Sequence, residues 1–138
     1  MINMKVSTGL LSALAVVALL AGCATAPDVA EQTVEERAQA RWDHLVARQF
    51  GQAWEYYSPG FRATTTAEDY TFDMVRRQVR WTAAEVLGSE CEEDRCQVTY
   101  RVEYRPVTGP SHFRGMALSR TQEESWIRSD GQWWYVQN

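Results

Sequence analysis

The apolar positions of this chain follow three spacings, and each spacing predicts a different kind of segment. Residues 10–20 form an unbroken run of apolar and small residues, LLSALAVVALL, which is shorter than the ~20 residues needed to span a bilayer. From about Glu31 the apolar positions recur every three or four residues, as in an amphipathic helix. From residue 81 they alternate with polar positions, as in a strand with one buried face. The sequence therefore predicts an export signal, then helices, then strands.

The first predicted helix begins near residue 31 and has one apolar stripe, with Phe50 as a possible extension. The stripe consists of Val34, Ala38, Trp42, Leu45 and Val46. The other face is expected to be solvated and consists of Glu35, Glu36, Arg37, Arg41 and Arg48. A stripe of this kind is typical of core packing, so we interpret it as core and not as a cofactor site.

Two further helices are predicted before the strands. The second covers about residues 52–57 and ends at Ser58-Pro59-Gly60, because Pro and Gly interrupt helices. Thr66 is expected to cap the third, since Thr66 and Asp69 have the spacing of a capping box. This third helix is predicted over residues 67–79.

Four strands are predicted, at 81–90, from 96 to about 105, from 113 to about 128, and at 133–136. The second has the clearest alternation, with Cys96, Val98, Tyr100, Val102 and Tyr104 on one face. Asp130-Gly131 between the last two strands is a hairpin signal. Helices followed by an antiparallel meander give an α+β fold, with N-terminal helices packed on a four-stranded sheet.

Composition limits the partners of the region after residue 22. That region holds thirteen arginines and eighteen acidic residues, a formal charge of −5, and the one lysine of the chain, Lys5, precedes it. A mildly acidic domain with scattered arginines is a poor candidate for binding nucleic acid. It also lacks the basic cluster that would bind an anionic lipid surface.

Residues 20–23, Leu-Ala-Gly-Cys, follow the apolar run directly. Together with Lys5 they resemble the signal of bacterial lipoproteins, in which this cysteine is diacylated, the chain is cut before it, and the new amine is usually acylated, for example with palmitate. The resemblance implies a signal peptide at 1–22, a lipidated tether at 23–30 and one domain at 31–138. It also implies attachment of Cys23 to the cell envelope through acyl chains, at the outer membrane if the host is Gram-negative. The alternative is an ordinary secreted protein in which Cys23 is incidental.

Cys91 and Cys96 are the two remaining cysteines and flank four charged residues. An exported protein enters an oxidising compartment, where a pair across a tight hairpin is normally a disulfide. The alternative is a metal site that uses both thiolates and the acids between them. It is less favoured because zinc prefers two more soft ligands, and no other Cys or His lies nearby in the sequence.

The region from residue 31 resembles the nuclear transport factor 2-like superfamily. The resemblance rests on Tyr57-Ser58-Pro59 with Arg62, on Glu124-Ser125-Trp126, and on Asp130-Gly131-Gln132-Trp133. It implies a curved sheet that wraps the helices into a cone, often with a pocket at the open end. The superfamily includes ketosteroid isomerases, dehydratases and non-catalytic binding modules, so the fold alone does not decide the function.

A set of aromatic and polar side chains is the candidate lining of such a pocket. It consists of Trp42, Tyr57, Trp81, Tyr100, Arg120, Gln122, Glu124 and Trp126. A bulge could instead turn Arg120, Gln122 and Glu124 to solvent. We see no Gly-rich phosphate loop, His-Glu-x-x-His or Gly-x-Ser-x-Gly motif.

Two functions are compatible with these residues. The favoured one is a lipid-anchored, non-catalytic domain that binds an envelope protein or a small amphipathic ligand, without cofactor or metal. The alternative is an isomerase- or dehydratase-type enzyme that uses a buried carboxylate as its base. An unpaired carboxylate in a deep pocket would favour the enzyme, whereas a pocket filled by Trp and Tyr rings would favour binding.

Overall fold

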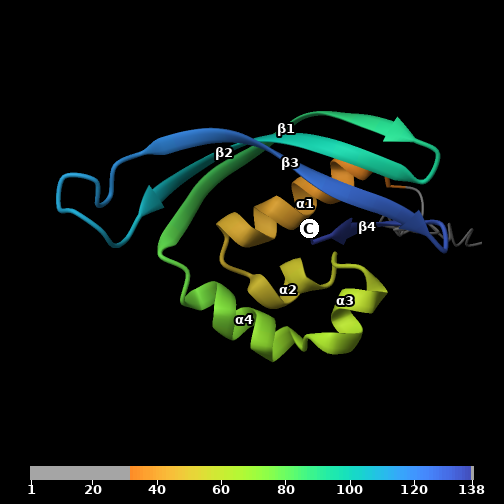
Figure 1. The fold of residues 1–138 in the computed structure, drawn as a ribbon, viewed down its shortest axis with the longest axis horizontal. Helices are drawn as coiled ribbons and strands as arrows, with labels where there is room; N and C mark the ends of the chain where they lie inside the picture. Colours follow the sequence, from red (N-terminus) through yellow and green to blue (C-terminus); the bar gives the residue numbers. More distant parts are fainter. Residues whose placement is uncertain (1–31, 138) are drawn as a thin grey trace, which may run out of the picture.

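The computed structural model describes residues 32–137, which fold as four helices followed by four strands (Figure 1). The helices are α1 (Val34–Val46), α2 (Phe50–Trp54), α3 (Pro59–Thr64) and α4 (Ala67–Val75). The strands are β1 (Val79–Glu92), β2 (Arg95–Pro106), β3 (Leu118–Ser129) and β4 (Gln132–Val136). The predicted signal peptide, Cys23 and the tether lie outside the described residues. No helix of the described region is long and apolar enough to cross a membrane.

The helix starts follow from their capping residues. Thr33 and Glu36 form a capping box at α1, in which each side chain bonds the backbone of the other. The predicted cap at Thr66 is confirmed, because its hydroxyl accepts from the Asp69 amide. Ser58 caps α3, a short helix that the sequence analysis did not predict. The Ser58-Pro59 pair ends one helix and also begins the next, since Pro is favoured at the first helical position.

Several predicted boundaries are wrong. Helix α1 spans Val34–Val46 and does not reach Phe50, which begins α2, and α2 ends at Trp54 and not at Tyr57. Helix α4 ends at Val75, not near Val79, and β1 begins at Val79. Strand β3 begins at Leu118, not at Phe113. The residues before it form a turn in which Gly109 and Gly115 have positive φ, and Phe113 and Met116 are exposed. Chain reversal here requires the left-handed backbone that Gly adopts without strain.

The strands form one antiparallel sheet in the order β1-β2-β3-β4. The predicted alternation of β2 is confirmed, with Cys96, Val98, Tyr100 and Val102 buried. β1 has two register shifts against β2, between Trp81 and Ala83 and between Val86 and Gly88. Such bulges bend a strand and change which residues face inward. Figure 1 shows the sheet arching over α1.

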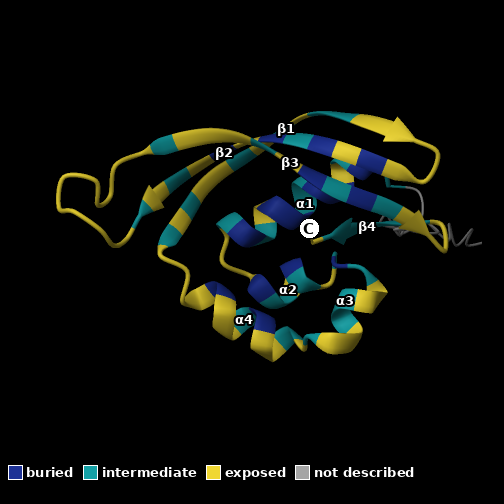
Figure 2. Cartoon of the chain, viewed as in Figure 1, coloured by how far each residue is buried: buried dark blue, intermediate teal, exposed yellow. Residues whose placement is uncertain are grey.

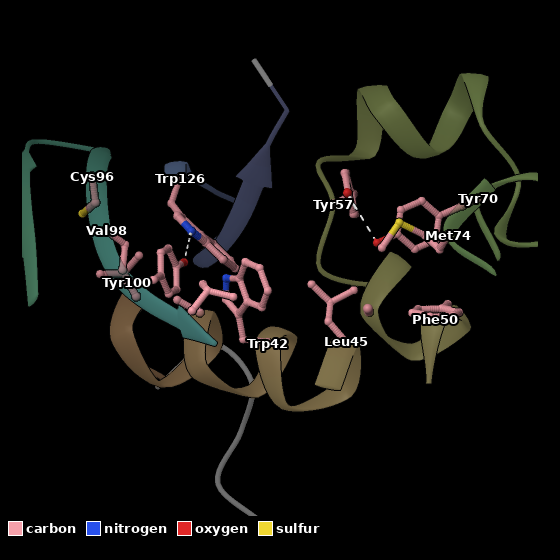
Figure 3. Packing of buried hydrophobic residues seen from close by; sticks show 14 residues of the cluster. Trp42, Leu45, Phe50, Tyr57, Tyr70, Met74, Cys96, Val98, Tyr100 and Trp126 are labelled. Atoms are coloured by element: carbon pink, nitrogen blue, oxygen red, sulfur yellow. Dashed lines mark hydrogen bonds between the residues drawn. The ribbon is translucent and has the colours of Figure 1, made fainter. Parts of the chain in front are cut away.

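The core lies between the inner face of the sheet and the helices, and α1, α2 and α4 all contribute buried residues to it (Figure 2). Trp42 of α1 packs against Trp81 and Tyr100, with ring centroids 5.8 Å away in both cases. Trp126 is fully buried, and its indole N–H donates to the Tyr100 hydroxyl at 2.9 Å (Figure 3). Aromatic side chains of this size each bury about 150–250 Å², so a few of them supply much of the core of a small domain.

The polar face predicted for α1 is partly wrong. Arg37 and Arg41 are 4% and 3% exposed, although both were expected to be solvated. Arg37 donates through Nε to the Trp133 carbonyl of β4. β4 folds back beside the helices, so it covers a face of α1 that would otherwise be open to solvent.

Candidate functional site

A cavity of about 230 Å³ lies between the inner face of β3, the end of β4 and the helices. Its lining residues are Arg41, Trp42, Leu45, Tyr57, Met74, Arg77, Trp81, Arg120, Gln122, Glu124, Tyr135 and Gln137. Its walls therefore combine aromatic rings with three arginines and one carboxylate. It is smaller than the roughly 300–1,000 Å³ of most small-molecule sites.

The structure brings together six of the eight residues predicted to line a pocket. These six are Trp42, Tyr57, Trp81, Arg120, Gln122 and Glu124. The other two, Tyr100 and Trp126, do not line the cavity, because both are fully buried beneath it in the core. β2 and β3 pair without a register shift, so no bulge turns the polar residues of β3 to solvent.

The Arg41–Glu124 ion pair is buried in the cavity wall. Nη1 of Arg41 lies 3.0 Å from Oε2 of Glu124, and the two side chains are 4% and 9% exposed. The Gln122 amide donates to the other carboxylate oxygen at 3.4 Å. A buried carboxylate needs such partners, because removing a charge from water without compensation is costly.

Tyrosines complete the surroundings of Arg41. Its Nη2 donates to the Tyr57 hydroxyl at 3.3 Å, and the Tyr57 hydroxyl lies 3.5 Å from that of Tyr70 (Figure 3). The guanidinium carbon lies 3.8 Å from the ring centroid of Tyr135, as in a cation–π contact. Burial alone would lower the pKa of Arg41, but Glu124 and these tyrosines outweigh it and raise that pKa above its ordinary value. Arg41 is therefore a permanent positive charge.

The buried tyrosines are neutral at physiological pH. Burial raises the pKa of Tyr135 to about 12, although Arg41 acts in the opposite direction. Burial and then the charge of Glu124 raise the pKa of Tyr100, and burial and then Tyr57 raise that of Tyr70. Their hydroxyls can therefore donate hydrogen bonds but do not act as bases near neutral pH.

Two arginines of the lining form no ion pair with another described residue. Arg77 and Arg120 both lie at exposed positions, whereas the described ion pairs are Arg41–Glu124 and Arg101–Glu85. The guanidinium of Arg120 lies 5.7 Å from the ring centroid of Tyr104. With Arg41 and Glu124 neutralising each other, the cavity has a positive excess from Arg77 and Arg120.

The sequence interpretation missed Arg41 as a functional residue. The signal that could have found it is its spacing, since Arg41 lies three residues after Ala38 and four before Leu45, within the buried stripe. An arginine at that phase of a helix either ends in solvent or has a partner inside. Here the partner is Glu124, 83 residues away in the sequence.

The two cysteines and the three acidic residues between them lie at the β1–β2 hairpin, and none of them lines the cavity. A disulfide joins Cys91 and Cys96, which face each other across the β1–β2 hairpin with 4.1 Å between their Cα atoms. Bonded sulfurs are not available as thiolate ligands. Within residues 32–137 no group of three or more His, Cys, Asp or Glu side chains is placed to hold a metal ion.

The arrangement favours binding over proton transfer. A general base must reach the proton that it abstracts, and its carboxylate must be free to accept it. The Glu124 carboxylate is already held by Arg41 and Gln122. The unpaired cations and the aromatic walls, in contrast, suit an anionic group attached to an apolar one.

Comparisons with known proteins show similarity at the level of the fold. No family model and no curated protein matches this chain. A SEC-C motif containing protein from Rhodopseudomonas palustris aligns with 18% identity over 76% of each chain, with a TM-score of 0.58. A second such protein, from Psychrobacter arcticus, aligns with 11% identity and the same TM-score, and the match covers 77% of this chain and 59% of that one. These neighbours share the mixed α+β architecture.

Proposed function

We propose that this chain is a lipid-anchored envelope protein whose domain binds an anionic, partly apolar group and does not catalyse a reaction. The observation that carries the proposal is the cavity wall, in which the buried carboxylate is paired with Arg41 while Arg77 and Arg120 are not. The lipoprotein-like residues before Ala24 supply the anchor in this account, and more than one acyl chain makes anchoring stable.

The domain is, in this proposal, a nuclear transport factor 2-like cone. The bulges of β1, the arch of the sheet over α1 and the cavity beside the end of β4 support it. In such a cone, the cavity lies at the open end. Its volume of about 230 Å³ suits one ring or one side chain with its charged group.

Calorimetry with 4-phenylbutyrate tests the binding function. The probe has a ring for the aromatic walls and a carboxylate for the arginines, and 4-phenyl-1-butanol is its uncharged counterpart. With the full chain in nanodiscs, we expect the carboxylate to bind at least about tenfold more tightly than the alcohol, since charge-assisted hydrogen bonds contribute about 1.5–3 kcal/mol. Arg120→Gln should remove that preference. Arg101→Gln, on the outer face, is the matched control and should retain it.

The enzyme alternative has its own test. An isomerase-type site would exchange the protons next to a carbonyl, so 4-phenyl-2-butanone in D2O is a suitable probe. We expect no exchange above the buffer rate. Exchange that the wild type accelerates and that Glu124→Gln abolishes would overturn the proposal and establish the enzyme.

A further inference from the structure

One inner strand of the sheet, β3, is unpaired along part of one side within residues 32–137. β4 pairs with β3 only over residues 125–129 of β3. Residues 118–124 of β3 therefore have β2 on one side and no strand of the described region on the other. Each alternate residue of that edge presents backbone N–H and C=O groups that a further strand could bond.

The two outer strands of the sheet, β1 and β4, have a few of their edge backbone groups bonded by helix or loop residues. On β1, the Gln39 amide donates to the Ala84 carbonyl and accepts from the Val86 N–H, both at 2.9 Å. On β4, the Tyr135 N–H donates to the Tyr56 carbonyl at 2.8 Å, and the Tyr135 carbonyl accepts from the Ser58 N–H at 3.0 Å. Helix and loop segments thus satisfy part of the backbone at both outer edges of the sheet.

The cavity opens beside the unpaired edge. Arg120, Gln122 and Glu124 line it from the inner face of β3, and all three lie in the unpaired segment. Gln137, one residue beyond β4, lines it from the other side. The cavity thus occupies the position over which a longer β4 would pass. A strand added to this edge would have alternate side chains directed into it.

We propose that the partner is an extended peptide segment of another protein that adds as a strand to residues 118–123 of β3 and inserts one acidic side chain into the cavity. Main-chain pairing supplies affinity in this mode of recognition, and a pocket for an alternate side chain supplies specificity. The inserted carboxylate meets Arg77 and Arg120, which form no ion pair with the described residues. This inference rests on the proposed function, and it names the class of partner for the same cavity.

A second copy of this chain fits the edge less well. Antiparallel pairing of two β3 edges would bring the Arg120 of the second copy to the site, which adds a positive charge. It would not supply an added anion for Arg77.

The test uses one peptide with two altered forms. The probe is a seven-residue peptide of alternating valine and threonine with a central glutamate, capped at both ends. One form replaces the glutamate with glutamine, and the other carries N-methyl groups on alternate backbone nitrogens, which prevents strand pairing. Binding to the full chain in nanodiscs is measured together with hydrogen exchange of the β3 amides.

We expect the glutamate peptide to bind and to slow exchange of alternate amides in 118–123, by about tenfold or more at saturation. The glutamine and N-methyl forms should each bind about tenfold more weakly, as should Arg120→Gln with the parent peptide, while Arg101→Gln should not. Binding without protection of β3, or equal binding of the N-methyl form, would overturn strand addition. If 4-phenylbutyrate still binds in that case, the proposed function stands and only this inference fails. Protection that rises with protein concentration in the absence of peptide would also overturn it, in favour of self-pairing.

Discussion

At the scale of single residues, the contribution of the Arg41–Glu124 pair to stability is the difference between two opposing free-energy terms. Burial penalises both charges, and their mutual attraction and hydrogen bonds offset that penalty. Such a pair adds little net stability when it is intact. Removing one partner is different, because it leaves the other charge buried and uncompensated.

Glu124→Gln should therefore destabilise the protein by about 3–5 kcal/mol, the range measured when one partner of a buried ion pair is removed. Urea unfolding of the full chain measures this loss. Glu123→Gln is the matched control, since Glu123 is exposed, and it should change stability by less than about 0.5 kcal/mol. The double variant Arg41→Met, Glu124→Leu should recover much of the loss. Unchanged stability of Glu124→Gln would show that the pair does not form.

The raised pKa values of the buried tyrosines predict that the protein loses stability at alkaline pH. Burial raises the pKa of Tyr70, Tyr100 and Tyr135 above 10, and that of Tyr135 to about 12. The folded state then holds protons that the unfolded state loses near pH 10, so stability is complete below about pH 10 and falls as the pH rises toward 12. Ultraviolet absorbance of tyrosinate, measured against pH, checks this. Titration of all six tyrosines near pH 10 in the folded protein would contradict it.

At the scale of elements, local signals predicted most of the structure. The stripe of α1, the cap at Thr66, the alternation of β2 and the Asp130-Gly131 turn are each encoded within a few residues. The boundaries of β1 and β3 and the bulges were missed, because they depend on pairing with β2. The buried state of Arg41 was missed because Glu124 of β3 and Tyr135 of β4 reach it only in the folded chain.

The β1–β2 hairpin carries a prediction about the disulfide. Cys91 and Cys96 close a short loop, so replacing both with serine should lower the free energy of unfolding by about 2 kcal/mol and leave the fold intact. Urea unfolding of the double variant measures the change. Two alkylatable thiols at these positions, in protein taken from the envelope without reductant, would contradict the pairing.

At the scale of the whole molecule, the order of helices and strands followed from the change of spacing along the chain. The position of the cavity could not be predicted from the spacing, although six of its lining residues were predicted as a set. Its position depends on where β4 ends against β3, and that register is a property of the assembled sheet. The proposed anchor lies outside the described residues and depends on Cys23.

Cys23→Ser should block acylation and signal removal, because the proposed lipid is attached through that thiol. The variant should keep its uncleaved signal, which gel mobility and mass spectrometry detect, and metabolic labelling should show no incorporated palmitate. Cys91→Ser with Cys96→Ser is the matched control and should still be acylated. If Cys23→Ser matures and fractionates with membranes as the wild type does, the lipoprotein interpretation is wrong.

Fluorine NMR of the six tryptophans, labelled as 5-fluorotryptophan in the full chain, tests the central claim most directly. Trp42 and Trp81 line the cavity, whereas Trp54, Trp133 and Trp134 do not. Titration with 4-phenylbutyrate should shift the resonances of Trp42 and Trp81, assigned by single Trp→Phe variants, in a saturable way, with little effect on the others. In Arg120→Gln the concentration of 4-phenylbutyrate needed for half of the shift should rise by about tenfold. Uniform or unsaturable shifts, or none, would show that this cavity is not a binding site for an anionic group.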